Sequence, residues 1–299
     1  MTRVSPKVLA LLALLTLVWG TNWPLFSIAL AELPVLTFRT IVLIAATIVL
    51  STIVLLRGES FAVPKGRWPV LIAASAMNLF VWNIATSLAV LYIPSGHASV
   101  LSYTMPLWVA LIGWIIFRQK LTGRLLLALL IGAAAVTALM APNFKSYGNA
   151  PWGLFWGLTA GFCWAIGTFI VKRTTWPGMG LSLTFWQVVI SLVPVSLGAL
   201  VIDGLPQRWP SAAALTATLY TGCIPMALGT ATWFALVKLL PAQIAALSSI
   251  AIPIVAIVSG ILILNEPLSL LQGAAIASTV ISLWLALVPG KQAPAKQAS

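Results

Sequence analysis

Long apolar stretches alternate with short polar breaks along the whole chain. Lipid offers the backbone no hydrogen-bond partners, so stretches that cross a hydrocarbon core of about 30 Å must be helical. The pattern predicts an all-α integral membrane protein with ten transmembrane helices. They are expected at roughly residues 7–30, 34–56, 68–91, 95–117, 122–141, 150–171, 180–202, 211–237, 242–264 and 269–288.

The second half of the chain repeats the first. Residues 147 positions apart match in the same order, among them Gly20 with Gly167, Pro94 with Pro241, Ser102 with Ser249, Pro106 with Pro253 and Gly113 with Gly260. Each copy holds five spans, and because five is odd the copies must cross the membrane in opposite directions. We expect inverted five-helix repeats over 1–146 and 147–289 around a central cavity, then a disordered cytoplasmic tail over 290–299.

Basic residues set the expected orientation. With a cytoplasmic N-terminus, thirteen of the sixteen Lys and Arg residues fall on the cytoplasmic side, and only Arg39, Lys145 and Arg208 do not. This distribution follows the positive-inside rule and predicts a bacterial inner-membrane protein with both termini in the cytoplasm. The net charge of +12 then reflects topology, and nucleic-acid binding is not expected because the basic residues are scattered over short loops.

Composition and motifs exclude several classes of function. The chain is 61% hydrophobic and 7% charged, against about 25% charged residues in soluble domains. It contains no phosphate-binding G-x-x-x-x-G-K-[ST] loop, no H-E-x-x-H motif and no cluster of Asp and His. We therefore expect no enzyme, no ATPase, no metal and no cofactor.

Prolines interrupt the centres of two matched spans. Pro106 and Pro253 each free the carbonyl four residues earlier, on Ser102 and Ser249. In an inverted pair these groups would meet near the midplane, although kinks that serve only helix packing are the alternative. The expected gating or hinge positions are Pro106, Pro253, Gly20 and Gly167.

Polar and aromatic residues at membrane depth form a candidate substrate site. An indole offers a flat face and one donor, which suits an amphipathic substrate, although each polar residue could instead bond a neighbouring helix. Trp108 and Trp186 are expected to face lipid. The candidate substrate-binding residues are Trp19, Asn22, Asn78, Trp82, Ser99, Ser102, Trp164, Thr168, Thr230, Trp233 and Ser249.

Ionisable groups at depth are scarce. Arg39 lies just inside the outer end of the second span, where it could reach water or bind substrate. His97, the single histidine, is expected at the outer mouth and is a candidate pH-sensing residue. No carboxylate falls in the middle of a span to carry a proton or a sodium ion, since all four lie in or beside loops: Glu32, Glu59, Asp203 and Glu266.

Several segments resemble the drug/metabolite transporter superfamily in its EamA branch, over essentially the whole chain. They are Trp19-Gly20, Phe38-Arg39, the Pro94, Pro106 and Gly113 series, and the Leu264-Asn265-Glu266-Pro267-Leu268 turn. Within the branch the chain looks most like YddG-type exporters of aromatic and other amino acids. The resemblance implies a basket-shaped bundle with its cavity walled by spans 1, 3, 4, 6, 8 and 9, and it adds inward roles for Tyr103 and Ser248. Gln119 departs from the family, which commonly has Glu there.

These observations predict a monomeric exporter of small amphipathic metabolites, amino acids including aromatic ones, that works in the bilayer by alternating access without ATP hydrolysis. Serine hydroxyls and the freed carbonyls would hold the ammonium group, while the tryptophans and Tyr103 would surround the side chain. Coupling to protons through His97 is the weaker option. The alternatives are an exporter of drugs, quaternary amines or nucleosides, and a membrane scaffold that transports nothing.

Overall fold

The computed structural model describes residues 6–116, 118, 123–146, 150–204, 208–233 and 242–287. Within these residues all regular structure is helical, and three short segments, labelled η, have the wider π-helical turn. The helices are α1 (Pro6–Leu30), α2 (Val35–Leu56), α3 (Trp68–Ser75), η1 (Ala76–Val81), α4 (Trp82–Tyr92), α5 (Ser95–Ser102), α6 (Met105–Ile115), α7 (Gly123–Ser146), α8 (Ala150–Arg173), α9 (Ser182–Gly198), η2 (Ala199–Asp203), α10 (Ala212–Thr221), η3 (Gly222–Gly229), α12 (Ala242–Leu264) and α13 (Leu270–Leu287).

Seven helical stretches of the described chain are long and apolar enough to cross a membrane. The other three expected spans correspond to α7, α12 and α13, where shorter apolar runs lie at 126–135, 252–264 and 273–282. The protein is thus a multi-pass membrane protein, and the full count of ten spans stays a prediction. The expected tail over 290–299 lies outside the described residues.

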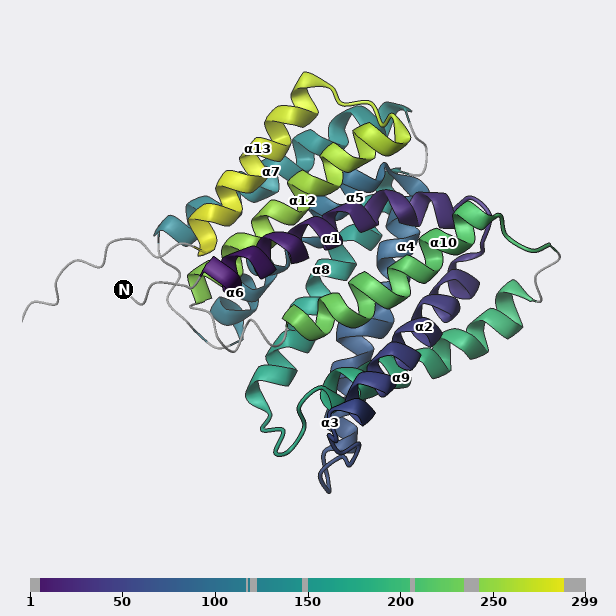
Figure 1. The fold of residues 1–299 in the computed structure, drawn as a ribbon. Helices are drawn as coiled ribbons and strands as arrows, with labels where there is room; N and C mark the ends of the chain where they lie inside the picture. Colours follow the sequence, from purple (N-terminus) through teal and green to yellow (C-terminus); the bar gives the residue numbers. More distant parts are fainter. Residues whose placement is uncertain are drawn as a thin grey trace, which may run out of the picture.

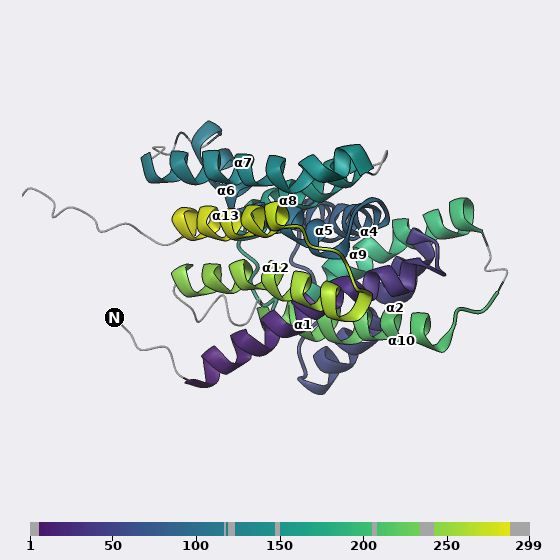
Figure 2. The same cartoon turned by 90° about the horizontal axis from the view of Figure 1, so that it is seen from above.

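Helix neighbours pair the two halves of the chain with each other. α1 packs on α12 and α10, while α8 packs on α5, α6 and α4. α2 contacts η3 and α9 contacts η1, and α2 and α9 also lie against each other. At one side of the bundle α7 pairs with α13 (Figure 1), and seen from above α13 lies between α7 and α12 (Figure 2). Most of the described helices of one half are therefore held mainly by helices of the other.

A row of glycines lets α8 approach α5 and the start of α6 closely. Gly153, Gly157 and Gly161 recur every four residues, the spacing that brings small side chains onto one face of a helix. A Cβ atom at Gly157 would lie 2.6 Å from the Cβ of Leu101, and one at Gly161 would lie 2.9 Å from the carbonyl oxygen of Ser102. The contact between these helices therefore depends on the absence of side chains.

Carboxylates tie the ends of α2 and α9 together. Glu59, just beyond α2, accepts a 2.7 Å hydrogen bond from the backbone N–H of Leu181 at the start of α9. Asp203, at the end of η2, accepts bonds of 2.7 and 2.9 Å from the backbone N–H and hydroxyl of Thr37 in the first turn of α2. Free N–H groups and the helix dipole both favour an anion at these positions.

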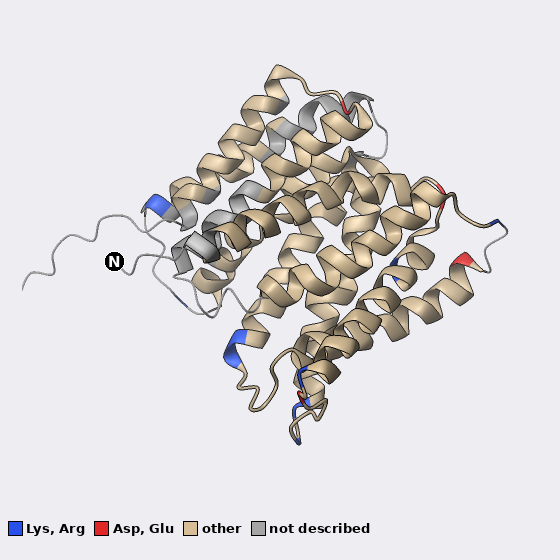
Figure 3. Ribbon diagram, viewed as in Figure 1, with Lys and Arg blue, Asp and Glu red and all other residues tan. Residues whose placement is uncertain are grey.

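The remaining two acidic residues bind helix starts in the same way. Glu32 accepts from the backbone N–H of Ser211 at 2.6 Å and from its hydroxyl at 2.5 Å, at the N-terminus of α10. Glu266 accepts from the backbone N–H groups of Ser95 and Gly96 at 2.7 and 3.3 Å, at the N-terminus of α5. Charged positions therefore gather mostly at the ends of helices and in connections (Figure 3). All four carboxylates of the chain hold helices that are distant in sequence.

The packing predicts unequal effects of one substitution at two glycines. Gly157→Ala should lower the free energy of unfolding by about 1–3 kcal/mol, because the new methyl group overlaps Leu101. Gly123→Ala is the matched control at the start of α7, where nothing lies within 4 Å of the added carbon. There alanine should be neutral or stabilise by up to about 1 kcal/mol. Unfolding of the purified variants in detergent checks this, and equal stabilities would contradict it.

The cap at Glu32 predicts a dependence of stability on pH. The hydroxyl and then the backbone N–H of Ser211 lower the pKa of this carboxyl below its ordinary value of 4.5. A lowered pKa in the folded state gives stability that is present above pH 4.5 and is lost as the pH falls through the folded value. Glu32→Gln should therefore lower the Tm at neutral pH and should cost progressively less below pH 4.5.

A double variant supplies the control for this cap. Ser211→Ala removes the same hydroxyl, so the Glu32→Gln difference should shrink in its background. A Tm difference between wild type and Glu32→Gln that stays constant from neutral to acidic pH would contradict the assignment.

Candidate substrate cavity

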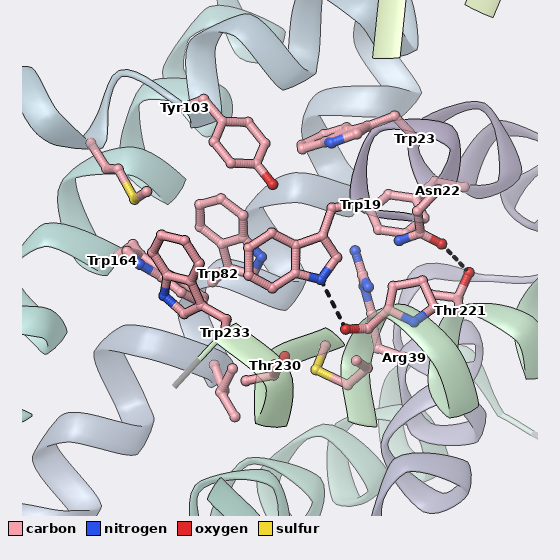
Figure 4. Close-up of a pocket in the computed structure, with 15 residues that line it drawn as sticks. Trp19, Asn22, Trp23, Arg39, Trp82, Tyr103, Trp164, Thr221, Thr230 and Trp233 are labelled. Carbon is pink, nitrogen blue, oxygen red and sulfur yellow. Dashed lines mark hydrogen bonds between the residues drawn. The ribbon is translucent and has the colours of Figure 1, made fainter. Parts of the chain in front are cut away.

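A cavity of about 70 Å³ lies between helices of both halves (Figure 4). α1, α2, η1, α4, α6, α8, α10 and η3 contribute to its wall, together with the junction between α5 and α6 and the helical turn over 230–233. The lining residues are Trp19, Asn22, Trp23, Phe26, Arg39, Leu79, Trp82, Tyr103, Met105, Trp164, Thr221, Pro225, Met226, Thr230 and Trp233. One face of α1 supplies four of them.

Aromatic contacts join the two halves across the cavity. The ring centroids of Trp19 and Trp233 are 5.6 Å apart, and those of Trp82 and Trp164 are 4.7 Å apart. The ring of Tyr103 lies edge-on to Trp82 at 6.2 Å. Each indole pair combines a helix of the first half with one of the second, so the wall is shared between the halves.

The π-helical segments shape two sides of this wall. η1 carries Leu79 and leads into Trp82, while η3 carries Pro225 and Met226. Both segments lie at matched positions of the 147-residue repeat, and π-turns often occur at functional sites. In η3, the carbonyl of Pro225 accepts a 3.0 Å hydrogen bond from the indole N–H of Trp19. The wider turn thus fixes one indole of the opposite half.

The break between α5 and α6 directs Tyr103 into the cavity. Pro106 lies in the first turn of α6, and the chain makes a turn at Tyr103 and Thr104. The carbonyl of Ser102 lies against Gly161 of α8, and Ser102 is not among the residues that line the cavity. The turn before Pro106 therefore places Tyr103 in the cavity wall.

The serine hydroxyls of α5 do not line the cavity. Ser99 donates to the carbonyl of Gly96 at 2.7 Å, and Ser102 donates to that of Ala98 at 2.9 Å. Both serines are fully buried. A buried hydroxyl without water nearby bonds a carbonyl on the preceding turn of its own helix. A role of these two serines in substrate binding stays a prediction. Ser248 and Ser249 lie outside the residues whose side chains are described.

Arg39, for which the sequence left contact with water or with substrate open, lies in the cavity wall. It is 1% exposed, with Nε donating to the hydroxyl of Ser87 at 2.6 Å and Nη2 donating to that of Thr86 at 2.9 Å. Its guanidinium carbon lies 4.2 Å from the centre of the Phe26 ring. These inward partners on α4 and α1 outweigh the attraction of water, so the side chain does not extend to the membrane surface.

Other expected site residues serve contacts between helices. Asn78 donates to the side-chain oxygen of Gln187 at 3.1 Å, and it lies so close to Gly167 that a Cβ there would overlap its amide. Gly20 similarly has no room for a side chain beside Val255 on α12. Both glycines are close-packing positions, and their role as hinges stays a prediction.

The remaining sequence expectations fall outside the wall. His97 is buried within α5, not exposed at a mouth. Thr168 is half-buried on α8 and Pro253 lies inside the unbroken helix α12; neither lines the cavity. Trp108 and Trp186 were expected to face lipid and are half-buried, with the indole of Trp186 donating to the carbonyl of Phe61 at 2.7 Å.

Several residues of the wall were not among the predicted substrate-binding residues. Trp23 and Phe26 follow Trp19 at four and seven positions, so the helical period could have placed them on the same face. Thr221 donates to the amide oxygen of Asn22 at 2.8 Å, a pairing without any local signal in the sequence. The other lining residues without a predicted substrate contact are Leu79, Met105, Pro225 and Met226.

The chain is similar to known transporters along most of its length. The model of a family described as the EamA-like transporter family matches residues 6–141 and again residues 151–288. The "Uncharacterized transporter YvbV" of Bacillus subtilis strain 168 is 27% identical over 279 residues, which cover 91% of this chain and 90% of the relative. The "Probable amino-acid metabolite efflux pump" of Salmonella typhimurium strain LT2 is 23% identical over 291 residues, covering 91% and 92%.

A protein of known crystal structure shares the fold. It superposes with a TM-score of 0.66 over 92% of this chain and 96% of the other, at 16% sequence identity. The two family matches together span nearly all of the described helices. The chain belongs to the EamA-like transporter family, within the drug/metabolite transporter superfamily, and it is a membrane transporter.

Proposed function

We propose that this transporter exports small amphipathic metabolites, amino acids including aromatic ones, through the cavity and without ATP hydrolysis. The observation that carries the proposal is a wall in which five indoles surround a few polar groups. Indole faces accept an apolar or aromatic side chain, and the polar groups can orient a polar head. The name of the Salmonella relative, an amino-acid metabolite efflux pump, supports the same class of substrate.

Transport requires the wall to separate. The cavity of about 70 Å³ is well below the roughly 300–1,000 Å³ of small-molecule sites. Trp19 meets Trp233, and Trp82 meets Trp164, across the boundary between the halves. Movement of one half against the other would part both indole pairs and admit a substrate, as alternating access demands.

The helix contacts support two inverted repeats over 1–146 and 147–289. Exchanging the halves converts the pairing of α1 with α12 and α10 into that of α8 with α5, α6 and α3, and the π-segments η1 and η3 exchange likewise. An inverted pair provides the two related states that alternating access needs. Pro106, Gly20 and Gly167 are the proposed hinge positions.

The basic residues support an inner-membrane location in a bacterium with both termini in the cytoplasm, since thirteen of sixteen then obey the positive-inside rule. Each carboxylate of the chain binds a helix start, so none is available at mid-membrane for ion coupling. We therefore propose facilitated or exchange transport. Proton coupling through His97 is the alternative.

Export of drugs or quaternary amines is a second candidate. Its support is the indole wall, because cations bind aromatic faces. The guanidinium of Arg39 in the same wall opposes it, since like charges repel in a medium of low dielectric constant.

A flux assay tests the proposal. Proteoliposomes with the purified protein should take up labelled phenylalanine or methionine without an ion gradient. Trp164→Leu should lower this flux about tenfold or more, because it removes one indole of the wall. Trp209→Leu is the matched control, since Trp209 is 93% exposed and should leave the flux unchanged.

Four results would count against the proposal. Complete dependence on a pH gradient would reject ion-independent transport. Equal flux in the two tryptophan variants would show that the substrate does not pass through the cavity. Absence of flux, with both variants folded by gel filtration, would favour a scaffold, whereas competition by quaternary amines would favour the second candidate.

A further inference from the structure

The cavity wall holds a positive charge without an acidic partner. Arg39 is buried, and among the residues that the structure describes no carboxylate lies within 4.0 Å of its guanidinium. The four acidic side chains of the chain are engaged at the starts of α2, α5, α9 and α10. The charge of Arg39 is therefore not neutralised within the described protein.

Neutral groups hold the guanidinium in place. Ser87 and Thr86 accept from Nε and Nη2, and the hydroxyl of Thr86 itself donates to the carbonyl of Trp82 at 2.8 Å. The rings of Phe26 and Phe38 lie 4.2 and 4.8 Å from the guanidinium carbon. Nη1 donates no hydrogen bond to any described residue. The guanidinium is thus oriented by two hydrogen bonds, and Nη1 can still donate to a ligand.

A buried cation without a counter-ion is unfavourable, and contacts with aromatic faces offset only part of the cost. The planar guanidinium matches a carboxylate, to which it can donate short, charge-assisted hydrogen bonds. We infer that Arg39 binds the carboxylate of the transported substrate. The inference rests on the proposed function, because it names the charged group that the same cavity recognises.

The wall treats the two ends of an amino acid differently. Apart from Arg39, the polar groups of the wall are all neutral. They are the indole N–H groups and the side chains of Asn22, Tyr103, Thr221 and Thr230. Among the described residues that line the cavity, none is an anion that could bind an ammonium group. The substrate class is therefore apolar and aromatic monocarboxylates, of which amino acids are one kind, with the carboxylate required and the ammonium dispensable.

Two ligands of nearly equal shape, which differ in carboxylate against amide, measure the contribution of the carboxylate to binding. Binding of 3-phenylpropanoate and of 3-phenylpropanamide to the purified full chain is followed by quenching of tryptophan fluorescence. The wild type should bind the carboxylate about 10–100 times more tightly than the amide, the range expected for a charge-assisted hydrogen bond. Arg39→Gln should reduce this ratio to about 1.

The matched control is Arg57→Gln, in which the same change is made at the other end of α2. The side chain of Arg57 is 64% exposed. This variant should keep the wild-type ratio. An unchanged ratio in folded Arg39→Gln, or a ratio that falls equally in both variants, would overturn the inference.

The wild type alone provides a test that survives misfolding of the variant. Phenethylamine carries the ammonium and lacks the carboxylate, so it should bind at least about tenfold more weakly than 3-phenylpropanoate. Equal or tighter binding of the amine would overturn the inference. Phenylalanine flux without carboxylate selectivity would reject only the role of Arg39, whereas selective binding without any flux would reject the proposed transport and keep the binding site.

Discussion

Hydrogen bonds from helix starts to carboxylates are the interaction on which the arrangement of the helices depends. A helix end exposes several N–H groups that hydrocarbon cannot satisfy, and a carboxylate accepts from one or two of them while it complements the helix dipole. The chain has four acidic residues, and each one caps a helix more than 120 positions away in sequence. The acidic side chains thus serve to join helices, and the charge of the buried Arg39 has no carboxylate partner among the described residues.

The absence of water in the membrane interior also determines which side chains line the cavity. Hydroxyls such as those of Ser99 and Ser102 bond their own helices, and amides such as that of Asn78 bond a neighbour, so these groups leave the wall to larger side chains. The cavity is lined mainly by aromatic and thioether surface, together with Arg39 and the neutral polar side chains of Asn22, Thr221 and Thr230. The π-turns and the break before Pro106 decide which of these side chains point inward.

Much of this could be read from the pattern of apolar residues. The expected spans over 34–56, 68–91 and 150–171 agree within two residues with the observed helices, because span length and polar breaks are local properties. Periodicity also brings Trp19 and Asn22 to one face of α1. The side-chain orientation of Arg39 could not be predicted, since its partners Thr86 and Ser87 come from another helix. Whether a serine hydroxyl bonds its own helix or faces a cavity likewise depends on tertiary packing, which the local sequence does not specify.

The caps at the two ends of α2 and α9 couple the lengths of helices that are far apart in the sequence. Asp203 reaches the start of α2, and Glu59 beyond its end reaches the start of α9. Axial sliding of one against the other would break both bonds, so the pair resists shear. Adding a single residue to either helix would displace its end by about 1.5 Å, more than a 2.7 Å hydrogen bond tolerates. An insertion in one of these helices would therefore need a compensating change in the other.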